Sequence, residues 1–537
     1  MGIPSYFSHI IKNYASIIKN LQHVYNNVQI EHLYMDCNSI IYDAVHSIEK
    51  EQSVDIESDI IKKVIVNIKK YIEIIRPTKT IFIAFDGVAP FAKMDQQRTR
   101  RYKNAFLSKI SFDDANKKKG WNTSAITPGT TFMEKLSSAI NYEFKYCEKR
   151  YNCLNILVSC SDQEGEGEHK LFQHLRENNF LNDTVSVYGL DADLIMLSIF
   201  HLKYCGNIYI FREAPEFLKS SIPVDVRGKE SEPYFLDIRH LASCILSEMD
   251  CKFSDKQRIH DYVFICFFLG NDFLPHFPAM NIRTHGIQAL LDIYRMVIGN
   301  YQDRYFISKN NGKIQWRNVR IFISEIAKRE HEFLMNEYYV RDKFDKRYFP
   351  ETTPKEKEDV LQNAPIIYRQ KEKYICPQEP EWEKRYYKSL FSLQRTSDNL
   401  KNISMNYLEG LEWTYKYYTS GCPDWKWKYN YSYPPLFMDL VNYIPHFETD
   451  FIIVSSNNRS FFPYTQLAYV LPFENLHLLP NKLCEFLRNN YSEQYPTTYE
   501  LEWAYCRYLW ESHPVLPDIS LETLENLDIQ FRMCEVN

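Results

Sequence analysis

The sequence lacks the features that mark secreted, zinc-binding and membrane proteins. Its 13 cysteines are scattered singly without a CxxC pair, and neither Cys147 nor Cys153 has a histidine at zinc-ligand spacing. An odd number of cysteines with no pairing framework indicates reduced thiols and a cytoplasmic location. The N-terminal stretch MGIPSYFSHIIKNY has no apolar signal core. The longest apolar runs, such as YVFICFFLG at 262–270, are too short to span a bilayer, so we expect no membrane association.

The chain also lacks a strong charge of one sign. Its formal net charge is −5 over 537 residues. No overall field therefore draws it to nucleic acid, and such binding requires a local basic patch. Hydrophobic residues make up 45% and charged residues 25%, which is typical of globular proteins. A chain of this length exceeds one simple core, and two or three domains are expected.

The first half of the chain alternates strand-like and helix-like segments. Four short buried strands are predicted, at 31–36, 80–86, 154–160 and 184–191. Helical patterns separate them, for instance at 54–75. Strands that alternate with helices predict an α/β domain with a mainly parallel sheet, here over residues 1–290.

The second half has a different composition. Residues 291–380 are predicted to form a helical connector, and within it residues 350–380, rich in proline and charge, form a linker or an exposed excursion. Residues 381–537 are rich in aromatic side chains and form a further region. The sequence shows no internal repeat and no low-complexity tract.

Acidic side chains follow the predicted strands. Three of the four strands end in Asp36, Asp86 and Asp191, and the remaining one leads into the acidic stretch SDQEGEGEHK at 161–170. Because the carboxyl ends of parallel strands share one edge of a sheet, these acids are expected to converge. A single aspartate in such a position is most often a turn residue or a helix cap. That interpretation is acceptable for any one of these acids but less so for all of them together.

Several carboxylates around one cleft repel one another unless cations offset their charge. Divalent metal supplies that charge, and Mg²⁺ suits sites made of oxygen ligands, with Mn²⁺ as a substitute. Two such ions about 4 Å apart can activate a water and stabilise the leaving oxygen of a phosphodiester. The acids therefore predict metal-dependent hydrolysis of a phosphate ester.

A basic segment follows Asp86 directly. From Lys93 to Lys119 the sequence has nine lysines or arginines against three aspartates, a local net charge of +6. Helical spacing places four side chains on one face, namely Lys93, Gln97, Arg100 and Arg101. Arginine forks, a lysine charge and an amide would hold a phosphate. The alternative is a solvated basic helix face, but the adjacent acids favour a phosphate site.

These motifs resemble the XRN family of 5′→3′ exoribonucleases. The resemblance is carried in order over nearly the whole chain by MGIPSYF, LYMDCNSIIYDAVH, AFDGVAPFAKMDQQRTRRY, ITPGTTFM, GEGEHKLF, YGLDADLIML and DYVFICFFLGNDFLPHFP, and farther on by EKRYYKSLF, YLEGLEWTYKYYTSGCPDWKWKYNYSYPP and FFPYTQLAYVLP. It implies a fold like that of PIN and flap nucleases, with residues 1–290 as the nuclease core and 381–537 completing the active-site pocket. The implied activity is hydrolysis of single-stranded RNA with a 5′-monophosphate to nucleoside 5′-monophosphates.

The resemblance also implies roles for individual residues. The ligands of the divalent metal, normally two Mg²⁺ ions, are Asp36, Asp86, Glu166, Glu168, Asp191, Asp193 and Asp272. The 5′-phosphate pocket is formed by Lys93, Gln97, Arg100 and Arg101. Pro90 lies where the family crowds the entrance against duplex RNA. Tyr42 and one of Trp425 and Trp427 are the candidates to hold the first base, since stacking tolerates any sequence.

The sequence departs from the family pattern in several places. Tyr42 replaces a usual histidine, Phe91 replaces a usual basic residue, and Glu164 replaces a usual proline, so that Asp162 and Glu164 are expected outside the ligand set. His169 is expected beside the metal site rather than in it. The large C-terminal domains of the cytoplasmic branch and the zinc-knuckle insertion of the nuclear branch have no counterpart, which implies a compact, divergent, monomeric member. A flap-type DNA nuclease and an inactive RNA-binding scaffold are the alternatives.

Overall fold

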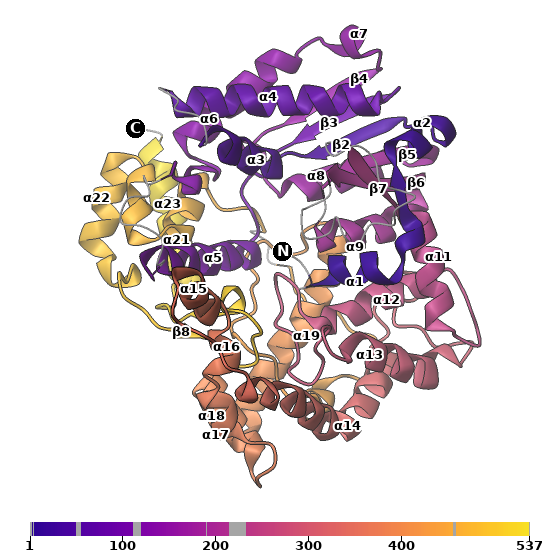
Figure 1. Cartoon of the computed structure of the whole chain (residues 1–537), viewed down its shortest axis with the longest axis vertical. Coiled ribbons are helices and arrows are strands. Elements are labelled where there is room, and N and C mark those ends of the chain that lie inside the picture. The colour runs from indigo at the N-terminus through magenta and orange to yellow at the C-terminus, as the bar shows by residue number, and fades with distance from the viewer. Residues whose placement is uncertain are drawn as a thin grey trace.

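The structure is a computed structural model that describes residues 3, 5–49, 55–110, 120–189, 191–213, 232–454 and 458–535. Within these ranges a seven-stranded sheet occupies the N-terminal part, and helices make up most of the remainder (Figure 1). None of the helices in the described ranges is long and apolar enough to cross a membrane.

The sheet is mainly parallel and has the strand order β1-β7-β6-β5-β2-β3-β4. All four predicted strands are confirmed, as β2 (His32–Asp36), β3 (Thr80–Ala84), β4 (Asn155–Ser159) and β5 (Phe180–Tyr188). The strands without a prediction extend the sheet beyond β5, as the parallel β6 (Cys205–Glu213) and the antiparallel β7 (Pro233–Asp237) and β1 (Ile18–Asn20).

Helices cover both faces of the sheet because successive strand residues point to opposite sides. On one face, Leu33 and Met35 pack against α3 (Asn38–Ile48), α4 (Ile56–Ile75) and α6 (Thr131–Phe144). On the other face, Tyr34 and Phe82 pack with α8 (Gly167–Asn178) and α9 (Ala192–His201). Helix α4 confirms the helix predicted at 54–75, and Asp55 caps it by accepting a hydrogen bond from the Ser58 amide at 3.2 Å.

A helical region extends the core of the second face. It contains α11 (Ile238–Met249), α12 (Arg258–Cys266), α13 (Gly286–Tyr294), α14 (Trp316–Asp342) and α19 (Ser397–Thr419). Side chains of α19 belong to the same buried cluster as those of α8 and α9. The aromatic-rich region is therefore packed against the α/β part, as predicted.

The last helices of the chain pack on α5 (Phe91–Ile110), the basic segment of the sequence. They are α21 (Pro463–Val470), α22 (Asn481–Asn490) and α23 (Leu521–Glu535), which lie beside α5 in Figure 1. Phe91 and Met94 of α5 share a buried cluster with Leu467 and Leu487 of these helices. The basic helix is thus held between the nuclease-like sheet and the end of the chain.

The segment 350–380 differs from the expected linker. It forms α15 (Pro354–Gln362), α16 (Ala364–Ile367) and α17 (Gln370–Ile375). Its charged residues are partly buried as pairs: Glu372 binds Arg341 at 2.6 Å and Arg369 at 2.7 Å. Composition alone indicated exposure, but paired charges of opposite sign can be buried when their hydrogen bonds are satisfied.

Helix α9 ends at a buried histidine that gives the fold a dependence on pH. His201 is fully buried, its Nδ1 donates to the Leu197 carbonyl at 2.7 Å, and its Nε2 accepts from Arg176 at 3.0 Å. Burial lowers the pKa of His201 to about 3. Between that value and about pH 6.5 the unfolded chain binds a proton that the folded chain does not, so stability falls as the pH falls.

We predict that His201→Gln makes stability less dependent on pH below about 6.5. The difference in slope should approach about 1.4 kcal/mol per pH unit, the free energy of one proton taken up only by the unfolded chain. The measurement is the urea midpoint of unfolding between pH 6.5 and 4.5. His23→Gln, at an exposed position, is the control for loss of a histidine. Equal slopes for wild type and His201→Gln would contradict this account.

Candidate active site

The seven predicted acids come from the carboxyl edge of the sheet and from one adjoining turn. Asp36 ends β2 and Asp86 follows β3 by two residues. Glu166 and Glu168 occupy the cap and first turn of α8, and Asp191 and Asp193 the same positions in α9. Asp272 comes from the turn after the short 3-10 helix Phe267–Leu269. Two helix N-termini therefore point toward the acids and offset part of their charge.

Gly167 allows the first of these acids to approach one another closely. Its backbone amide donates to Oδ1 of Asp86 at 2.7 Å. A Cβ atom at Gly167 would lie only 2.8 Å from Oδ1 of Asp36. Asn38 binds Asp86 from the opposite side through its side-chain amide and also accepts from the Asp86 backbone amide at 3.1 Å. The glycines of GEGE thus serve close packing at Gly167 and a left-handed turn at Gly165, where φ is +96°.

Burial and mutual repulsion raise the pKa values of three of the acids, as is expected where a cation would offset their charge. Burial, together with the charge of Asp86, raises the pKa of Asp36 well above its usual range. Burial and the charge of Asp193 do the same to the pKa of Glu168. Burial and Asp272 raise the pKa of Asp193 to about 6. A bound cation would lower these raised pKa values again, because it favours the charged form of each carboxylate.

Lys93 supplies positive charge inside the cluster. Its ammonium lies 2.7 Å from Oε2 of Glu166 and 2.8 Å from Oδ2 of Asp272. Although burial opposes ionisation of Asp272, the Lys93 charge holds the pKa of that carboxyl well below its usual range. Lys93, predicted at the phosphate pocket, thus lies where the basic face of α5 meets the acids.

Two tyrosines from α19, absent from the predicted site, bind the acids directly. Tyr417 donates to Oε1 of Glu166 at 2.6 Å, and Tyr418 donates to Oδ1 of Asp193. His169 stacks on Tyr417 with ring centroids 3.6 Å apart. In the sequence these two tyrosines stand next to each other in the stretch TYKYYT. Because adjacent residues of a helix point in different directions, they bind two different acids. Only the long-range contact between α19 and the sheet edge gives them this role.

The oxygen atoms present fit a hard divalent cation. Glu166, Glu168 and His169 each place one potential ligand atom within 4.8 Å of the others. Oδ1 of Asp36 is buried and has no hydrogen-bond partner among the described residues, although a carboxylate oxygen rarely remains so. Carboxylate oxygens are the ligands that Mg²⁺ and Mn²⁺ prefer, which makes His169 a neighbour of the site rather than the first choice of ligand.

Exposure separates the acids of the stretch 161–170. Asp162 and Glu164 are exposed, whereas Glu166 and Glu168 are only 5% and 9% exposed. This agrees with the expectation that the first two lie outside the ligand set. Asp191 is also exposed, unlike the other predicted ligands, but its charge acts on Asp36 and so lies near the cluster.

The remaining polar residues of the predicted phosphate pocket lie along α5. Gln97 accepts from the Gln466 amide of α21 at 3.2 Å. Arg101 donates to Thr127 through Nη2, while its Nη1 is buried without a hydrogen-bond partner in the described part of the chain. Burial lowers the pKa of Arg101 to about 10, and the Tyr42 hydroxyl lies close enough to oppose that shift. A buried guanidinium with a free donor is suited to bind an anion.

The two candidate tryptophans have different surroundings. Trp427 is 8% exposed, stacks on Trp413 at 5.3 Å and donates to Glu409 at 3.3 Å, so its ring belongs to the core. Trp425 is half-buried, and its carbonyl accepts from the Phe91 amide at the start of α5. Pro90 is buried directly before α5. This arrangement favours Trp425 as the ring that can reach a base.

Comparison with known proteins assigns the family. Residues 1–214 match the family model described as "XRN 5'-3' exonuclease N-terminus", and residues 252–381 and 375–530 match the "Xrn1 helical domain". Together these matches cover most of the chain. The chain therefore belongs to the XRN family of 5′-3′ exonucleases.

Curated relatives align along almost the whole chain. The 5'-3' exoribonuclease 2 of Candida albicans is 24% identical over 98% of this chain and 72% of its own length. The homologue of that enzyme in Drosophila melanogaster is 25% identical over 98% of this chain and 70% of its own length. The 5'-3' exoribonuclease 1 of Schizosaccharomyces pombe is 25% identical over 97% of this chain but only 48% of its own length.

We predict that Tyr417→Phe raises the Mg²⁺ requirement of the site without unfolding the chain. Loss of the hydroxyl removes the hydrogen bond that orients Glu166, and such outer partners contribute about 10- to 100-fold to metal affinity or activity. The measurement is the Mg²⁺ concentration for half-maximal RNA cleavage, which should rise by about 10-fold. Tyr415→Phe is the control, because Tyr415 lies on the same helix but donates to the Gly312 carbonyl at 2.8 Å. Equal Mg²⁺ requirements in both variants would contradict the role of Tyr417.

Proposed function

We propose that this chain, a 5′-3′ exoribonuclease of the XRN family, removes nucleotides one at a time from single-stranded RNA that carries a 5′-monophosphate. The products are nucleoside 5′-monophosphates. The observation that carries this proposal is the junction at Lys93, where the acid cluster meets the basic face of α5. A hydrolytic centre beside a fixed anion pocket acts on the bond next to a terminal phosphate.

Binding of the RNA end orients the scissile bond. Arg100, Arg101 and Gln97 bind the 5′-phosphate, and the free Nη1 of Arg101 supplies one donor. Trp425 and Tyr42 hold the first base by stacking, which accepts any sequence. The fixed distance between phosphate and base positions the next phosphodiester at the acids, which lowers the entropy cost of reaction.

The carboxylates would hold two Mg²⁺ ions, which Mn²⁺ can replace. The ligands are Asp36, Asp86, Glu166, Glu168, Asp191, Asp193 and Asp272. Bound divalent cations lower the pKa of water and stabilise charge on the leaving oxygen. Tyr417 and Tyr418 orient Glu166 and Asp193, and Gly167 keeps Asp36 and Asp86 close together. Hydrolysis leaves a new 5′-phosphate on the shortened RNA.

Two rival functions use the same residues differently. A flap-type DNA nuclease shares the sheet and the acids, but the match to the "Xrn1 helical domain" covers the helical region at 252–530. An inactive RNA-binding scaffold would not need all seven acids, and the burial or half-burial of six of them supports a role in hydrolysis instead. The chain is proposed to act as a monomer in the cytoplasm.

We predict that Asp191→Ala lowers cleavage of 5′-monophosphorylated RNA by more than about 100-fold, because loss of a group that only orients a ligand already costs up to that much. Folding should be intact, since Asp191 is exposed and its removal relieves repulsion. The assay follows release of labelled mononucleotide from 5′-labelled RNA with and without Mg²⁺. Glu164→Ala, an exposed acid of the neighbouring stretch, is the control.

The same assay separates the rivals. Early labelled mononucleotide supports the proposal, whereas labelled longer fragments show an endonuclease. Preference for flap DNA over 5′-monophosphorylated RNA favours the flap-nuclease alternative. Equal cleavage of monophosphate and triphosphate ends contradicts the phosphate pocket on α5. Wild-type turnover in Asp191→Ala contradicts its place in the ligand set.

A further inference from the structure

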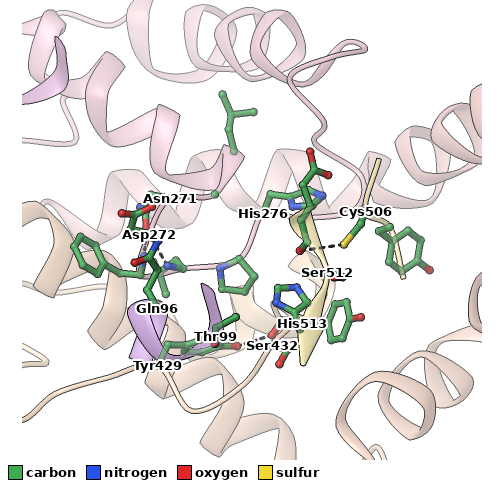
Figure 2. A pocket seen from close by; sticks show the side chains of 18 of the residues that line it. Gln96, Thr99, Asn271, Asp272, His276, Tyr429, Ser432, Cys506, Ser512 and His513 are labelled. Atoms are coloured by element: carbon green, nitrogen blue, oxygen red, sulfur yellow. Dashed lines mark hydrogen bonds between the residues drawn. The ribbon is translucent and has the colours of Figure 1, made fainter. Parts of the chain in front are cut away.

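A second cavity lies beside the active site. Its volume of about 360 Å³ falls in the range of about 300 to 1,000 Å³ that is usual for small-ligand pockets. Its walls come from α5, the loop 269–283, the segment 428–433 and the segment 504–513, which ends in strand β9 (His513–Pro514). Figure 2 shows Gln96, Asp272, His276 and His513 around this space.

The cavity adjoins the acid cluster through one residue. Asn271 and Asp272 form part of its wall (Figure 2). The carboxylate of Asp272 is the one that binds Lys93 at 2.8 Å, and Lys93 in turn binds Glu166. Most predicted metal ligands are absent from the cavity wall. The cavity therefore shares Asp272 with the predicted ligand set and Arg100 with the predicted phosphate pocket, and otherwise lies beside the catalytic edge.

Two cations in the cavity wall have no acidic partner. Lys103 is only 6% exposed, and its ammonium donates to the Ser512 carbonyl at 3.2 Å. Arg100 lies about one helical turn before it. Among the described residues neither forms an ion pair. A buried ammonium with unused donors is costly unless an anion binds it.

The other charges of the wall are already compensated. Arg283 pairs with Glu511, and Lys428 lies 3.2 Å from Asp95. Burial lowers the pKa of His276 and of His513 to about 4, so both rings are neutral near pH 7 and can donate or accept hydrogen bonds. The surplus positive charge is thus confined to Arg100 and Lys103.

The rest of the wall suits a flat heterocycle. Tyr429, Tyr431 and Trp510 contribute aromatic rings, and aromatic rings stack on nucleic-acid bases of any sequence. The side-chain Oε1 of Gln96 and Nδ2 of Asn271 are buried without hydrogen-bond partners among the described residues. An acceptor and a donor without partners can recognise the polar edges of a bound molecule.

We propose that this cavity binds a nucleoside 5′-monophosphate, with its phosphate on Lys103 and its base among the aromatic rings. The anion site and the aromatic wall are features of the cavity whether or not the chain cleaves RNA. The choice of a nucleotide rests on the proposed function, because hydrolysis releases this compound on the other side of Asp272. Inorganic phosphate alone would leave the aromatic wall uncovered, and a nucleoside alone would leave Lys103 without an anionic partner among the described residues.

The binding test uses the full chain in EDTA and isothermal titration with AMP, UMP, uridine and inorganic phosphate. Both nucleotides should bind at least 10-fold more tightly than uridine or phosphate. Lys103→Met should weaken nucleotide binding at least 10-fold. The matched control is Lys109→Met, because Lys109 lies on the same helix but is half-exposed and pairs with Glu474. Tyr431→Ala, with the thermal midpoint of each variant as a check on folding, tests the aromatic wall separately.

Three results would overturn the proposal. The first is absence of nucleotide binding to the folded wild-type chain. The second is binding that persists in Lys103→Met but disappears in Arg101→Met, since the nucleotide would then occupy the 5′-phosphate pocket of the active site. The third is equal binding of AMP and inorganic phosphate, which would exclude a nucleotide site.

A second experiment identifies the source of the nucleotide and separates this proposal from the proposed function. A single turnover of 5′-labelled RNA is carried out with Mg²⁺, and excess unlabelled AMP is then added. The label that stays bound to the protein is measured. Label that is retained by the wild type but lost from Lys103→Met shows a nucleotide that arrives from the reaction, whereas equal loss of label from both proteins contradicts retention of the product in this cavity. If RNA is not degraded but AMP still binds through Lys103, the exoribonuclease function fails and the cavity stands.

Discussion

Repulsion between buried carboxylates is the constraint on which this structure depends. Three strand ends and two helix starts bring acids to one edge of the sheet, and burial raises the pKa of Asp36, Glu168 and Asp193. The fold offsets this with the helix N-termini, the Lys93 ammonium and the hydroxyls of Tyr417 and Tyr418. These contacts orient the acids, while Oδ1 of Asp36 has no hydrogen-bond partner in the described part of the chain and so can serve as a cation ligand.

Helix α5 connects this constraint to the rest of the chain. At the start of the helix the Phe91 amide donates a hydrogen bond to the Trp425 carbonyl, and the C-terminal helices pack along its apolar side. Its polar residues face two spaces, the proposed phosphate pocket and the cavity around Lys103. The position of a single helix therefore determines how the acids, the RNA end and the second cavity relate to one another.

Much of this arrangement could be predicted because it follows local patterns. Each predicted strand was marked by a short apolar run, and the acids that follow the strands meet because parallel strands share an edge. Within the stretch 161–170, Asp162 and Glu164 are exposed as predicted, whereas Glu166 and Glu168 are buried. The family resemblance supplied the ligand assignments, which stay predictions, and the match to the XRN family is confirmed.

The rest depends on contacts between distant segments. Nothing near Tyr417 in the sequence indicates that its hydroxyl reaches Glu166, 251 residues away. Charge and proline in 350–380 suggested a linker, yet Glu372 and Arg341 bury each other. Such dependence on late segments also has a consequence during synthesis. The N-terminal sheet can fold first, but its last strand ends at Asp237, and Tyr417, Tyr418 and Gln466 are made 180 or more residues later. A nascent chain therefore lacks the contacts that orient its acids and hold Gln97 until these late segments have left the ribosome.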